Sequence, residues 1–236
     1  MTRDNRPVAD GVVESESLIA RMQAAGASTF RLLGREWELD AGVFSPAYTY
    51  ATAFYSRSIR YPIGGRFLEI GCGAGVTAVE AALAGCRAVH AVDICPRAVA
   101  NTLRNAARHD AQGVTAAVSD VFGAIDDDAR YDAIFWNIPY VAVPSSHSLA
   151  SALSRSVFDV EHRSCHAYLS GLRDHLAPGG TAYLGFGDIG DLGALESIAA
   201  EHGWEVHLIA AGAGEPDPQV EHRLYELLDS GRKRAR

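Results

Sequence analysis

A glycine-rich turn is the first feature of this sequence that could do chemistry. Residues 69–75 read Glu-Ile-Gly-Cys-Gly-Ala-Gly, between a short apolar run and an alanine-rich stretch typical of a helix. Glycines let the backbone turn tightly and let a ligand approach main-chain atoms. The G-x-G-x-G spacing differs from the G-x-G-x-x-G of dinucleotide-binding turns. Glu69 would repel a pyrophosphate but suits a cationic or amino-bearing ligand.

Acidic residues follow the next two apolar runs. Asp93 directly follows the run 88–92 and can accept hydrogen bonds from both hydroxyls of a ribose. It could also cap the helix that starts near Pro96. Asp120 follows the run 114–118 and could accept from the exocyclic amine of an adenine, or serve only as a loop acid. With the glycine turn, these positions favour a ribose-containing ligand.

A polar tetrapeptide, Asn137-Ile138-Pro139-Tyr140, follows the strongly apolar run 131–136. Asn-x-Pro is a good turn sequence and could be no more than that. The Asn137 side-chain oxygen and the Ile138 carbonyl can each accept an N–H. They would orient a nitrogen nucleophile and stabilise positive charge that develops on it. Tyr140 can stack on a flat substrate group.

The elements that must position these residues alternate along the chain. The patterns predict strands and helices in turn, followed by two strands. Expected strands are 67–70, 88–92, 114–118, 131–136, 181–186, 204–209 and 222–228, and expected helices are 76–84, 96–109, 165–176 and 192–202. Such alternation predicts a doubly wound, mostly parallel sheet, whose ligands bind outside the carboxyl ends of the strands.

The N-terminal part has weaker patterns. We expect no fixed structure for residues 1–10, a short helix over 15–25, and a hairpin of 35–39 with 43–44 around Asp40-Ala41-Gly42. The expected organisation is an N-terminal extension (1–42), one catalytic domain (43–230) and a basic tail (231–236).

The run from Phe67 to Phe122, with Asn137-Ile138-Pro139-Tyr140, resembles class I S-adenosylmethionine (SAM)-dependent methyltransferases. It is closest in motif to the release-factor glutamine methyltransferases and related N-methyltransferases. The resemblance implies a Rossmann-like, seven-stranded sheet whose last strand is antiparallel and inserted between two others. It implies SAM as cofactor, bound by Thr49, Glu69, Gly71, Cys72, Gly73, Gly75, Asp93, Ile94, Asp120, Val121 and Asn137. In this scheme the turn carries the methionine part, Asp93 the ribose, and Ile94, Asp120 and the Val121 amide the adenine.

The reaction end departs from the family pattern. Ile138 replaces the second residue of an Asn-Pro-Pro-Tyr motif that marks methylation of planar nitrogens, while the catalytic set remains Asn137, Ile138, Pro139 and Tyr140. Tyr48 and Tyr50, in a segment that resembles the cofactor-pocket entrance, are candidates for substrate binding. Only about 42 residues precede that segment, in place of the release-factor enzymes' N-terminal helical domain, which argues against a release factor.

Residues 141–165 read as a long serine- and histidine-rich insert, of the kind that often binds ligands. His147, His162 and Arg163 are candidates for gripping a substrate carboxylate or acting as a base, or are part of a solvated loop. Their spacing matches no metal site.

Composition limits the class of protein. With 236 residues, 48% hydrophobic and 21% charged, the chain is an ordinary globular one. It has no run of membrane-spanning length and no signal-peptide core, so we expect a cytoplasmic protein. The net charge of -8 makes a nucleic-acid partner unexpected.

We therefore expect a SAM-dependent methyltransferase that acts on a nitrogen, or less favourably an oxygen, of a small molecule, in a biosynthetic pathway. A protein glutamine is the second substrate choice. An NAD-dependent dehydrogenase and a non-catalytic cofactor-binding subunit are the alternatives of other classes.

Overall fold

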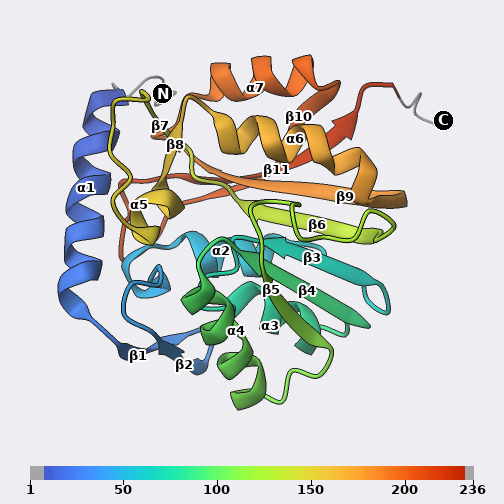
Figure 1. The fold of residues 1–236 in the computed structure, drawn as a ribbon, viewed down its shortest axis with the longest axis horizontal. Helices are drawn as coiled ribbons and strands as arrows, with labels where there is room; N and C mark the ends of the chain where they lie inside the picture. The colour runs from blue at the N-terminus through green and yellow to red at the C-terminus, as the bar shows by residue number, and fades with distance from the viewer. Residues whose placement is uncertain (1–7, 232–236) are drawn as a thin grey trace.

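A seven-stranded sheet forms the centre of the molecule (Figure 1). The computed structural model describes residues 8–231, and the strand order is β10-β11-β9-β6-β3-β4-β5. The strands are β3 (Arg66–Ile70), β4 (Ala88–Asp93), β5 (Val114–Val118), β6 (Tyr131–Asn137), β9 (Leu176–Gly187), β10 (Trp204–Gly212) and β11 (His222–Asp229). Only β11 runs antiparallel to its neighbours in this sheet, β10 and β9. The expected sheet, with its inserted antiparallel last strand, is confirmed.

Helices cover both faces of the sheet, as a doubly wound fold requires (Figure 1). Helices α6 (Arg163–His175) and α7 (Leu192–Glu201) pack on one face. Helices α2 (Ala51–Ser58), α3 (Val76–Leu83) and α4 (Pro96–Arg108) lie on the other. Strand β6 is buried by both layers, which explains its uninterrupted apolar run Ala133–Trp136.

The N-terminal hairpin lies earlier than expected. Strands β1 (Ser28–Leu32) and β2 (Arg35–Leu39) pair through the two-residue turn Leu33–Gly34. Both turn residues have positive φ, 52° and 76°, which matches the right-handed twist of the strands. The expected hairpin around Asp40–Gly42 is therefore wrong.

Helix α1 (Val8–Ala25) and the 141–165 region form a small separate core. The helix begins at Val8 instead of residue 15, so it includes residues for which we expected no structure, while residues 1–7 lie outside the described chain. Residues 141–165 are partly regular: β7 (Val141–Val143) pairs in parallel with β8 (Phe158–Val160), and α5 (Ala152–Val157) connects to β8. The core contains Ile19, Met22, Val141, Val143, Leu153 and Phe158. This packing holds α1 near the carboxyl ends of β6 and β9 (Figure 1).

A short 3₁₀ turn, Pro46–Tyr48, precedes α2. Within residues 8–231 no helix combines the length and apolar character of a membrane span. The basic residues 232–236 lie outside the described part of the chain.

Candidate active site

Three cavities meet at the carboxyl ends of the central strands. The helix cavity, of about 470 Å³, lies beneath α1 and is lined by Phe44, Tyr48, Thr49, Asn137–Tyr140 and Pro216–Val220 among others. The strand-end cavity, of about 420 Å³, is lined by Gly71, Asp93, Ile94, Asp120 and Val121 among others. The turn cavity, of about 70 Å³, lies beside Glu69 and Gly71–Ala74. Asn137 and Ser156 line all three cavities, so this is the point where two ligands could meet.

The glycine turn is packed so closely at Gly71 and Gly75 that neither position has room for a side chain. A Cβ on Gly71 would lie 2.6 Å from Nε1 of Trp136, and one on Gly75 would lie 2.7 Å from Cα of Thr102. Both glycines also have positive φ. A Cβ on Gly73 would meet nothing within 4 Å. The turn thus presents open space at Gly73, where a ligand can approach the backbone.

Helix α4 anchors this turn through polar side chains that the sequence analysis missed. Thr102 Oγ1 donates to the Gly73 carbonyl at 3.2 Å, and Asn105 Nδ2 donates to the Ala74 carbonyl at 2.8 Å. Thr102, Asn105 and Asn101 are fully buried. Their i, i+4 spacing on one helix face was the available signal, because a face that packs on a sheet is normally apolar.

Asp93 is fixed at the end of β4 by two backbone donors. Its Oδ2 accepts from Gly73 N at 3.0 Å and its Oδ1 from Cys95 N at 2.8 Å. Burial raises the pKa of this carboxyl, and the two N–H groups oppose that rise. Asp93 therefore orients the start of α4 and the turn together, and each oxygen keeps a lone pair for a further donor such as a hydroxyl.

The strand-end cavity has a mixed apolar and polar wall. Ile94 is 40% exposed although it is a large apolar side chain. The neighbouring loop is tied by Ser119 Oγ, which donates to the Val121 carbonyl at 2.9 Å and accepts from Ala124 N at 2.9 Å. Asp120 lines the same cavity. An apolar surface beside hydrogen-bonding groups suits a flat heterocycle.

Glu69 is a buried carboxyl beside the turn cavity. Burial raises its pKa to about 8, although hydrogen bonds from Thr77 and Ala78 N–H oppose the rise. Its Oε2 atom is buried and has no hydrogen-bond partner among the described residues. Such an oxygen is stabilised by a cationic donor placed in the turn cavity.

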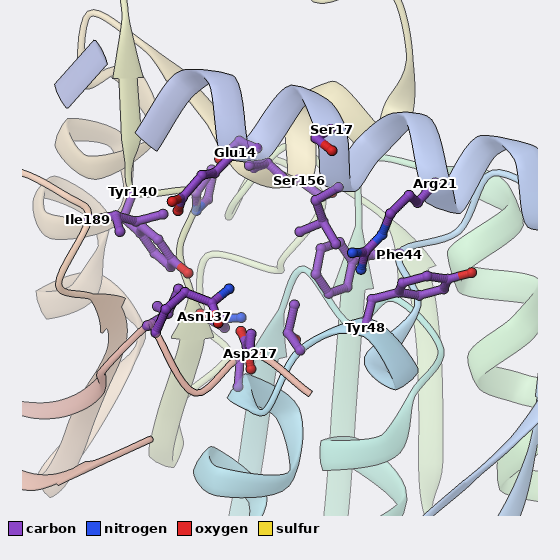
Figure 2. A pocket seen from close by; sticks show the side chains of 18 of the residues that line it. Glu14, Ser17, Arg21, Phe44, Tyr48, Asn137, Tyr140, Ser156, Ile189 and Asp217 are labelled. Atoms are coloured by element: carbon purple, nitrogen blue, oxygen red, sulfur yellow. The ribbon is translucent and has the colours of Figure 1, made fainter. Parts of the chain in front are cut away.

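Asn137 ends β6 at the junction of the cavities. Its Oδ1 is buried and unpartnered within the described chain, as is Thr49 Oγ1 on the wall of the helix cavity. The Tyr140 ring packs on Phe186, with ring centroids 5.4 Å apart, and burial raises its pKa. Figure 2 shows Asn137 on the side of the cavity opposite α1. The predicted catalytic segment therefore lines a cavity with unused acceptors.

Asp217 lies on the same floor and was not predicted (Figure 2). It precedes β11 by five residues, and no motif marks it. Its Oδ1 accepts from Tyr50 N at 2.5 Å, and its Oδ2 lies 3.2 Å from Nε2 of His222. Only the packing of the connection between β10 and β11 brings it here.

The predicted substrate residues are distributed unevenly. Tyr48 lines the helix cavity, and Arg163 lines the strand-end cavity. The side chain of Tyr50 packs between Phe54 and His222 instead.

The two predicted histidines lie elsewhere. His147 packs against Phe158, with ring centroids 4.9 Å apart, and His162 precedes α6 with positive φ. Neither histidine lines any of the three cavities. Substrate roles for these residues stay predictions.

The sequence of this chain matches a known protein family. A family model described as methyltransferase small domain matches residues 36–156, more than half of the chain. The chain belongs to this family. A ribosomal protein L11 methyltransferase of Methylococcus capsulatus is 30% identical over 143 residues, which cover 61% of this chain and 40% of that protein. The chain thus spans less than half the length of that curated relative.

Solved structures of methyltransferases share the fold of this small-domain protein. SMU.776, a methyltransferase solved in complex with S-adenosylhomocysteine (SAH), has a TM-score of 0.59 at 15% identity, covering 85% of this chain and 56% of its own. A tRNA methyltransferase of M. jannaschii also has a TM-score of 0.59 at 15% identity, covering 87% and 57%. A fold shared with a tRNA methyltransferase gives no support to the expectation, drawn from the net charge of -8, that the partner is not a nucleic acid.

The cavities of this methyltransferase small domain fit SAM. The strand-end cavity offers Ile94 and Asp120 to an adenine and Asp93 to a ribose. The turn cavity offers the free Oε2 of Glu69 to an amino group. The fold is that of the methyltransferase small-domain family, and the individual cofactor contacts stay predictions.

Proposed function

We propose that this protein transfers a methyl group from SAM to a nitrogen of a small molecule bound in the helix cavity. The observation that carries the proposal is the unpartnered, buried Oδ1 of Asn137 at the junction of all three cavities. A buried amide oxygen without a partner is costly, and an N–H donor on the acceptor would remove that cost.

When bound, SAM would supply an electrophilic methyl carbon. Asn137 holds the acceptor N–H through Oδ1, and the Ile138 carbonyl is available as a second acceptor. Together they aim the nitrogen lone pair along the line of displacement and stabilise the charge that develops on nitrogen. Ile138 is only 2% exposed, so its backbone is held by packing even without the proline of the related motif.

The size and lining of the helix cavity favour a small acceptor. A volume of about 470 Å³ lies within the range of small-molecule sites. Phe44, Tyr48 and Tyr140 provide apolar ring surface for it. The L11 relative supports a second candidate, a protein side chain that enters the same cavity.

The test combines binding with transfer of label. Titration calorimetry should show binding of SAH but no comparable binding of NAD. With methyl-labelled SAM and an extract of the source cells, adding the protein should move label into a small molecule that chromatography of the ultrafiltrate separates from SAM and its breakdown products. Asn137→Ala should abolish this label while SAH affinity stays within about twofold. Absence of SAH binding, or label confined to protein or RNA, would overturn the proposal.

A further inference from the structure

The floor of the helix cavity contains an acidic residue that has no role in the methyl transfer proposed for Asn137 and Ile138. Asp217 is 8% exposed and lines the cavity together with Asn137. Figure 2 shows both residues on the side of the cavity opposite α1. A carboxylate beside the nitrogen-binding amide is placed to interact with the same N–H group.

The carboxylate of Asp217 is held in one orientation. One oxygen accepts the Tyr50 N–H at 2.5 Å and the other lies 3.2 Å from Nε2 of His222, a residue that is 1% exposed. Nδ1 of His222 is buried and has no partner within the described chain. The tautomer that carries its proton on Nε2 donates to this carboxylate oxygen. Each Asp217 oxygen retains a lone pair for another donor.

The groups that face Asp217 leave it available as a base. His222 contacts it from β11, and Tyr140 from the loop after β6 has its pKa raised by burial and by the charge of Asp217. Helix α1 contributes Glu14 and Arg21 to the opposite wall. The Arg21 guanidinium lies over an aromatic ring, 5.0 Å from its centroid. Within residues 8–231 no arginine forms an ion pair with Asp217.

We propose that Asp217 accepts the proton that the acceptor nitrogen gives up, and that His222 is its positioning residue. This inference rests on the proposed function. The nitrogen lone pair forms the new bond to the methyl carbon as the carbon–sulfur bond breaks, and the electron pair of that bond stays on sulfur as a neutral thioether. The methylated nitrogen then carries the positive charge. Its proton passes to the Asp217 carboxylate, which leaves a neutral product and a neutral acid that later releases the proton to solvent.

Sinefungin provides a test that does not require the acceptor to be known. In this compound a carbon with a primary amine replaces the methyl-bearing sulfonium, so its cationic amine occupies the transfer point, whereas SAH has no group there. Titration calorimetry gives the affinity of sinefungin divided by the affinity of SAH. A variant that lowers this ratio has lost a side chain that contacts the position of the transferred methyl group. We expect the ratio to fall about tenfold in Asp217→Asn, since tenfold corresponds to about 1.4 kcal/mol, the size of one charge-assisted hydrogen bond.

The variants remove the charge of Asp217 while keeping the hydrogen bonds that hold the local structure. Asparagine at 217 keeps an acceptor for the Tyr50 N–H. Asp188→Asn is the matched control, because Asp188 accepts Glu221 N at 3.1 Å nearby but does not line the helix cavity. His222→Gln retains a donor to Asp217, so its ratio of sinefungin affinity to SAH affinity should stay close to the wild-type value. His222→Leu has no such donor and should lower the ratio.

The outcomes distinguish this inference from the proposed function. If SAH does not bind the wild-type protein, the proposed function fails. If SAH binds but the ratio is unchanged in Asp217→Asn, or falls equally in Asp188→Asn, Asp217 does not reach the transfer point and this inference alone is wrong. An unchanged ratio in His222→Leu would remove the positioning role from His222.

Discussion

Single buried oxygens without partners mark both ends of the site. Glu69 Oε2 lies at the cofactor end, and Asn137 Oδ1 and Thr49 Oγ1 lie at the acceptor end. Burying a polar atom without a hydrogen bond costs free energy, so such atoms in a cavity indicate where a ligand completes the structure. These three unpartnered oxygens therefore indicate where hydrogen-bond donors of the ligands would bind.

Glu69 gives a prediction about stability and pH. Its folded-state pKa of about 8 lies above the ordinary value of 4.5, so the folded protein holds a proton that the unfolded chain releases. The free energy of unfolding should therefore decrease as pH rises from about 4.5 to 8. Glu69→Gln removes this dependence, so the stability of the variant relative to wild type should grow by about 1.4 kcal/mol per pH unit in that window.

Urea unfolding at several pH values between 5 and 8 measures this difference. Asp110→Asn, which neutralises an exposed carboxylate, serves as the control and should follow the wild-type curve. Parallel curves for Glu69→Gln and wild type would contradict the raised pKa.

Helix α4 joins the N-terminal hairpin to the glycine turn through hydrogen bonds of Asn105. Asn105 accepts from Glu38 N at 2.9 Å and donates to the carbonyls of Glu38 and Ala74. Arg104 and Arg108 form ion pairs with acids of the β2 segment at the surface, but such exposed pairs contribute little. The buried amide is the element that joins hairpin, helix and glycine turn.

Asn105→Ala should destabilise the protein by about 2–4 kcal/mol, because it leaves buried backbone groups without partners. It should also weaken SAH binding, since the glycine turn loses an anchor. Leu103→Ala on the same helix, where the side chain is 42% exposed, should cost less than about 1 kcal/mol. Equal losses in the two variants would show that the Asn105 contacts carry no special stabilisation. Denaturant unfolding and calorimetry provide the measurements.

In the whole molecule, the proposed cofactor site and the proposed acceptor site lie in different cavities. Helix α1 contributes residues to the helix cavity but none to the other two cavities. Its apolar face is covered by β7, α5 and β8, which form a core of their own. The proposed acceptor site thus lies between the sheet and an N-terminal helix that is far away in sequence.

Leu18→Trp tests this separation, because Leu18 faces the helix cavity. Filling that cavity should abolish label transfer to the acceptor while the affinity for SAH stays within about twofold. Glu16→Trp places the same ring on the exposed face of α1 and should leave both properties unchanged. A large loss of SAH affinity in Leu18→Trp would mean that the two ligands share this space.

The sequence by itself determined the sheet, the cofactor turn and the position of the tetrapeptide that begins with Asn137. These features depend on local rules: strand and helix periodicity, glycine geometry, and the fact that parallel strands end at one edge. Only the tertiary structure decided which distant groups complete the acceptor site. Asp217 carries no local signal, Thr49 was expected at the cofactor, and the helix expected over 15–25 had no expected role at the site. Their positions on the helix cavity arise from packing between segments that are up to about two hundred residues apart.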